Sequence, residues 1–162
     1  MEFGWINGIN LTAVILLILI NIVALKTGDA EGFSSKYRII NVLEQIGRYG
    51  CMIFMVLPIW IKNWKFGFQS VGEMFLWIAS TVILLLLYGF LWIKKRRGGI
   101  STLYGLAIIP VVLFLMNGVL LRHYSLIAAS FLFGVCHLLL VEIIMLIWSQ
   151  GIGKIKKCAF AV

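Results

Sequence analysis

Charged residues are scarce in this chain. Only 12% of its 162 residues are Asp, Glu, Lys or Arg, whereas a soluble domain carries about 25%. Proline is also rare, with two residues, and no low-complexity stretch is present, which excludes a disordered chain. Hydrophobic residues make up 62% of the chain. A soluble core of this size could not bury so much apolar surface, so the composition predicts a polytopic membrane protein.

The sequence also lacks the motifs of common catalytic and metal sites. It contains no HExxH, no GxSxG, no P-loop and no pair of aspartates suited to phosphoryl transfer. Its cysteines, Cys51, Cys136 and Cys158, match no CxxC, zinc or disulfide spacing. Cys51 and Cys136 fall in apolar stretches, so we expect them to be free thiols. We therefore expect no cofactor and no metal, and an enzyme is the less favoured class.

Five apolar segments approach the roughly 20 residues that a helix needs to cross a bilayer. They cover about residues 9–25, 46–61, 74–93, 103–121 and 126–148. Helices satisfy their own backbone polar groups in lipid, and the alternating pattern of a membrane β-barrel is missing. The expected fold class is therefore all-α. We predict a single transmembrane domain over residues 1–162, built as a compact bundle of five helices.

Basic residues are distributed unevenly between the two sides of this predicted bundle. Eleven lie between or flanking the first two spans, between the third and fourth, or after the fifth, and three lie on the opposite side. Because Lys and Arg are enriched in cytoplasmic loops, this asymmetry predicts an N-terminus outside and a C-terminus inside. The six tryptophans fit the same arrangement, since each lies near a predicted membrane boundary, as in an aromatic belt.

The net charge of +8 has a membrane explanation and does not indicate nucleic acid as a partner. Cytoplasmic Lys and Arg face anionic lipid headgroups, so the expected partners are the lipid bilayer and those headgroups. The expected location is the cell membrane, either a plasma membrane or a bacterial inner membrane, with several passes through it.

Glu142 is the one acidic residue deep within a predicted span. A carboxylate there must be protonated, paired with a cation or hydrated. Counting residues from the inner boundary puts Arg48 and Asn21 at a similar depth, so we predict an inner-leaflet polar cluster of Glu142, Arg48 and Asn21. Glu44 competes for the same arginine, because residues four apart on a helix can pair locally.

His137 and Asn117 are further polar residues within predicted spans. His137 shares a helix face with Ser130 and Gly134, a small-xxx-small pair that lets another helix approach closely. The favoured interpretation is a histidine bonded to a neighbouring helix or to a backbone carbonyl, and the alternative is a proton or ligand contact. For Asn117 the two interpretations are a hydrogen bond between helices and a proton or ligand contact.

These features favour a non-enzymatic accessory, immunity or assembly factor, because no rich polar pathway runs through the spans. The alternative is a small carrier, channel or ligand-binding protein that uses the Glu142 and Arg48 cluster. Five spans are few for a monomeric carrier, so that alternative requires a homo-oligomer or a partner membrane subunit. A lipid-modifying enzyme that uses Glu142, His137 or Arg48 is the third hypothesis.

Overall fold

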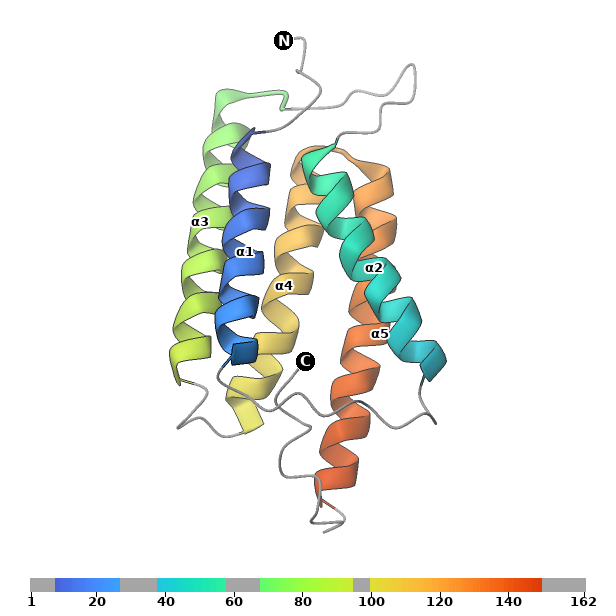
Figure 1. Ribbon diagram of the computed structural model, residues 1–162. Coiled ribbons are helices and arrows are strands. Elements are labelled where there is room, and N and C mark those ends of the chain that lie inside the picture. The colour runs from blue at the N-terminus through green and yellow to red at the C-terminus, as the bar shows by residue number, and fades with distance from the viewer. Residues whose placement is uncertain (1–7, 27–37, 58–67, 95–99, 150–162) are drawn as a thin grey trace.

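The computed structural model describes residues 8–26, 38–57, 68–94 and 100–149, and these residues form an all-helical bundle (Figure 1). The helices are α1 (Gly8–Lys26), α2 (Arg38–Val56), α3 (Val71–Lys94), α4 (Ile100–Leu120) and α5 (Tyr124–Ser149). No strand occurs in this described part of the chain. The predicted all-α fold class is confirmed.

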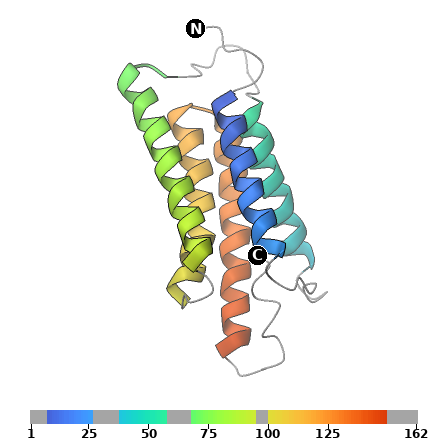
Figure 2. The same cartoon turned by 60° about the vertical axis from the view of Figure 1, so that its left-hand side comes forward.

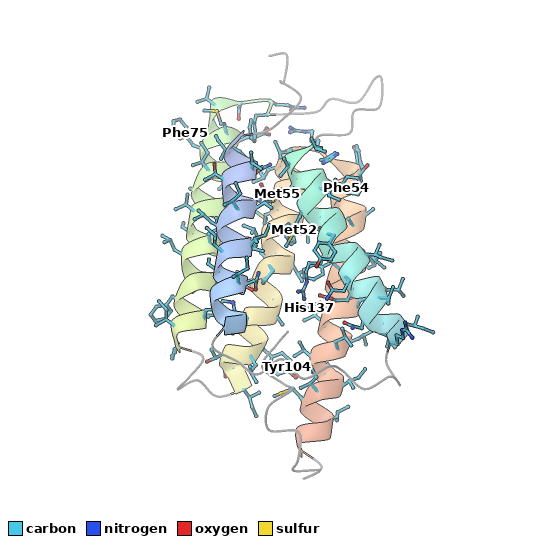
Figure 3. The ribbon with its side chains drawn as sticks, viewed as in Figure 1. Met52, Phe54, Met55, Phe75, Tyr104 and His137 are labelled. Carbon is cyan, nitrogen blue, oxygen red and sulfur yellow. The ribbon has the colours of Figure 1, made fainter. Side chains whose placement is uncertain are left out.

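Length and apolar composition make this bundle a membrane protein. Four helices, α2 to α5, are long and apolar enough to cross a bilayer, and α1 adds a shorter apolar segment, Gly8–Ile22. Large apolar side chains cover the outside of the bundle, including Ile39, Phe131 and Ile93, which are 77%, 72% and 81% exposed. Phe75 also points away from the bundle (Figure 3). Such an exterior is suited to contact with lipid.

The second helix differs most from its predicted span. We expected it to cover residues 46–61, but α2 begins at Arg38 and ends at Val56. It ends early because Pro58 has no backbone N–H and disfavours a helical conformation in the residue before it. It begins earlier than expected because its first turns are helical although they carry polar residues. One of these residues, Glu44, is buried against the other helices.

Consecutive helices run in opposite directions (Figure 1). The largest interfaces join α2 to α5, α5 to α4, and α4 to α3, while α1 makes smaller contacts with α2 and α3 (Figure 2). The end of α1, the start of α2, the end of α3, the start of α4 and the end of α5 lie at one end of the bundle (Figure 1). The basic segments adjoin these helix ends in sequence. The observed topology is therefore the one on which the N-out prediction rests, and the orientation itself stays a prediction.

Small residues set how closely the helices approach. A Cβ added to Gly47 of α2 would lie 2.8 Å from backbone atoms of Phe133 on α5. A Cβ added to Gly134 of α5 would lie 2.7 Å from a methyl group of Val111 on α4. Ser130, the other member of the predicted small pair, lies 3.7 Å from the thiol of Cys51 on α2. The two small residues of α5 therefore contact two different helices.

Candidate functional site

A buried carboxylate joins α2 to α5 in the half of the bundle near the start of α2. Glu44 is 1% exposed, and its Oε1 accepts a 2.9 Å hydrogen bond from Nε of Arg48, one turn further along α2. A second nitrogen of the same guanidinium, Nη2, also donates to this oxygen. Nδ1 of His137 on α5 lies 3.1 Å from it. We call Glu44, Arg48 and His137 the polar cluster.

Phe133 supports the polar cluster from one side. The His137 ring stacks on Phe133, with ring centroids 4.9 Å apart and an interplanar angle of 27°. The Arg48 guanidinium lies 5.8 Å from the centroid of the same ring, within range of a cation–π interaction. Because Phe133 sits one turn before His137 on α5, a single helix face supplies both the aromatic surface and the imidazole.

A small cavity adjoins the polar cluster. Its volume is about 20 Å³, enough for one water molecule. All five helices line it, and its polar lining is Asn21 from α1, Arg48 from α2, Tyr88 from α3 and His137 from α5. The Tyr88 hydroxyl donates a 2.8 Å hydrogen bond to Oδ1 of Asn21. His137 points from α5 toward the middle of the bundle (Figure 3).

Glu142 does not join this cluster, which corrects our prediction. Arg48 pairs with Glu44, the local alternative, and the Glu142 carboxylate instead accepts a long 3.5 Å hydrogen bond from the Tyr104 hydroxyl. Five residues separate Glu142 from His137, so the two side chains lie about 140° apart around α5. Since His137 faces the interior, Glu142 faces outward and is exposed.

The position of Glu142 along α5 explains how the carboxylate is tolerated there. It lies 18 residues after the start of α5 at Tyr124, or about 27 Å along the axis. The hydrocarbon layer is about 30 Å thick, so Glu142 can lie close to the polar boundary of the bilayer. Its partner Tyr104 also lies nearer than His137 to the end of the bundle where α4 begins (Figure 3).

Asn117 forms the interhelical bonds expected of it. Its Oδ1 accepts a 2.5 Å hydrogen bond from Nε1 of Trp77 on α3, and its Nδ2 lies 3.4 Å from Oγ1 of Thr81 on the same helix. Trp77 is 2% exposed, so this ring belongs to the α3–α4 interface and not to a lipid-facing belt. The belt interpretation is therefore corrected at Trp77, because the buried Asn117 gives its indole N–H a partner inside the bundle.

The remaining expectations concern the cysteines and the other tryptophans. Cys51 and Cys136 are buried free thiols, as expected. Cys158, Trp5, Trp60 and Trp64 lie outside the described residues.

A second ion pair, which we did not predict, lies at the opposite end of the bundle. Two nitrogens of Arg122 donate to the two carboxylate oxygens of Glu73, at 3.2 and 2.9 Å. Arg122 has a φ of 54° and follows the end of α4, where its N–H and that of His123 donate back to Val119 and Gly118. This Schellman motif usually carries glycine at the position of Arg122. The hydrogen bonds that Arg122 donates to Glu73 raise the pKa of Arg122.

Comparison with known protein families, curated proteins and solved structures finds no match. Within the described ranges, no three His, Cys, Asp or Glu side chains are grouped so that they could hold a metal ion. The fold and site together define a small integral membrane protein, a helical bundle with a buried polar cluster.

Proposed function

We propose that this protein is a non-enzymatic accessory, immunity or assembly factor of the cell membrane, in which the intramembrane polar residues hold the helices in place. One observation carries the proposal: polar side chains bond from helix to helix. Asn10 of α1 donates to the carbonyl of Met55 at the end of α2, and Tyr88 of α3 donates to Asn21 of α1. The Trp77–Asn117 bond joins α3 to α4, and the Glu44–His137 contact joins α2 to α5.

The energetics of lipid-embedded helices support this role. Lipid tails are as apolar as leucine, so helices in a bilayer gain little from hydrophobic burial against one another. Interhelical hydrogen bonds contribute roughly 0.6–2 kcal/mol each and add to close packing. The apolar exterior then remains available for lipid or for a membrane partner.

Abundance and activity measured together test this proposal. Trp77→Phe and Tyr88→Phe each remove one donor while keeping an aromatic ring. The phenotype of cells that lack the gene should be restored by each variant in proportion to its folded amount in the membrane. Fluorescence size-exclusion chromatography would measure that amount. A variant with wild-type abundance but no complementation would contradict a purely structural role for the lost donor.

A ligand-binding protein is the second candidate, and the cavity beside the polar cluster favours it. Groups from all five helices converge there, and the basic side chains among them are Arg48 and His137. The volume of about 20 Å³ admits a single water or an ion of similar size, and is too small for a polyatomic metabolite. This candidate places ligand binding at Arg48 and His137 in place of the Glu142 and Arg48 pair expected from the sequence.

A further inference from the structure

We propose that the cavity lined by all five helices binds one small monovalent anion of the size of chloride, together with a proton on His137. This inference rests on the second candidate function and names its ligand. Glu44 and Arg48 neutralise each other, so a neutral His137 leaves the polar cluster with no net charge.

Protonation of His137 would leave one positive charge without a counter-charge. The groups that face it are Glu44 and Arg48 from α2 and Tyr88 from α3. From α1 the lining carries Asn21, which does not ionise, and from α4 it carries only apolar residues: Leu106, Pro110 and Phe114. The single carboxylate is already bonded to Arg48. An uncompensated charge in an apolar interior is costly, and an anion in the adjoining cavity would remove that cost.

Donors for an anion remain after the internal bonds of the cluster are made. The Arg48 nitrogens Nε and Nη2 both donate to Glu44, and Nη1 makes no hydrogen bond with the described residues. A carboxylate oxygen accepts, so Nδ1 of His137 carries the proton of its contact with Glu44. Protonation then adds an N–H at Nε2, the other ring nitrogen. Arg48 and His137 both line the cavity, so it can offer an anion charge-assisted donors from two helices.

The orientation of α2 supports a polar ligand inside the bundle. Its apolar residues Ile39, Ile46 and Ile53 are 77%, 57% and 53% exposed, on the outer face. Its opposite face carries Glu44, Gly47 and Cys51, all of which are buried. A helix with its apolar face outward and its charged groups inward is the arrangement expected around an intramembrane polar site.

Proton and anion binding should reinforce each other, because each supplies the charge that the other lacks. Anion binding should therefore strengthen as the pH falls. We would measure the thermal unfolding of the purified full-length chain in detergent, in potassium chloride and in potassium gluconate of equal ionic strength. Gluconate is too large for the cavity, so the difference in Tm between the two salts measures the effect of chloride binding.

At pH 5.5 we expect chloride to raise the Tm by roughly 3–6 °C over gluconate, as for a ligand present well above its Kd. At pH 8 the two salts should give the same Tm. His137→Gln should show no chloride effect at either pH. His123→Gln is the matched control, because His123 is the chain's other histidine, is also buried and lies in the turn before α5, away from the cavity. It should keep the effect.

Equal Tm values for the wild-type protein in the two salts at pH 5.5 would overturn the anion site. This comparison needs no variant, so it holds even if His137→Gln does not fold. A chloride effect that survives in a folded His137→Gln protein would also overturn it. Either result would leave the structural proposal standing, because that proposal is judged by complementation and membrane abundance.

Discussion

The two carboxylate–arginine pairs of this bundle differ in their surroundings. The Glu73–Arg122 pair has two parallel hydrogen bonds, and its side chains are 30% and 28% exposed. The Glu44–Arg48 pair uses one carboxylate oxygen, its glutamate is 1% exposed, and a third group, His137, contacts the same oxygen. The outer pair has the better geometry, but the inner pair has lost more water. The stability of the fold should therefore depend more on the buried Glu44–Arg48 pair than on the exposed one.

Removal of the buried carboxylate should have the largest effect. Glu44→Leu leaves Arg48 without its counter-charge and His137 without its acceptor. We expect a loss of about 3–5 kcal/mol in the free energy of unfolding, the usual cost of breaking a buried ion pair. Denaturant unfolding in mixed micelles, followed by tryptophan fluorescence, would measure it. The double variant Glu44→Leu/Arg48→Leu should recover part of this loss, and a double variant as unstable as the sum of the single losses would refute the pairing.

A change in the packing of α2 on α5 should have the second-largest effect on stability, because this packing places Glu44 against His137. Gly47→Ala puts a Cβ 2.8 Å from the Phe133 backbone, which cannot move aside as a flexible side chain could. We expect a loss of about 1–3 kcal/mol from overpacking. Gly50→Ala is the matched control one turn later, since its Cβ would meet the nearest atom at 3.7 Å. Gly50→Ala should be neutral or slightly stabilising, and equal destabilisation by both variants would contradict the close approach at Gly47.

The exposed pair should give the smallest effect. Glu73→Gln removes the counter-charge of Arg122, but water and salt screen this pair. We expect a lower Tm at low ionic strength, by less than for either variant above, and no difference from wild type in about 0.5 M salt. Glu44→Gln should remain destabilised in the same salt. If salt rescued both variants equally, the difference in burial between the two pairs would not explain their roles.

The fold class was predictable because it depends on composition and on the length of apolar runs. The start of α2 was not, because a hydropathy count treats Glu44, Gln45 and Arg48 as a boundary. Those residues sit within a helix whose polar side faces the other helices. An inward-facing polar side lowers the hydropathy of a span without shortening it.

The Glu44–Arg48 pair was predictable from its i, i+4 spacing, but the contact with His137 was not, because 93 residues separate the partners. The distances of the two residues from their helix ends would have indicated this contact. Glu44 lies about 18 Å from the end of α2 at Val56, and His137 lies about 20 Å from the start of α5 at Tyr124. These two helix ends are at the same end of the bundle (Figure 1). Correct helix bounds would therefore have placed the two side chains at one level.

The most direct test of the polar cluster is a pair of double-mutant cycles in unfolding free energy. One combines Glu44→Gln with His137→Gln, and the other combines Glu142→Gln with Arg48→Gln. We predict a coupling of about 1 kcal/mol or more for Glu44 with His137, because their side chains touch, and none for Glu142 with Arg48. Coupling between Glu142 and Arg48, with additivity between Glu44 and His137, would contradict the arrangement of α2 against α5.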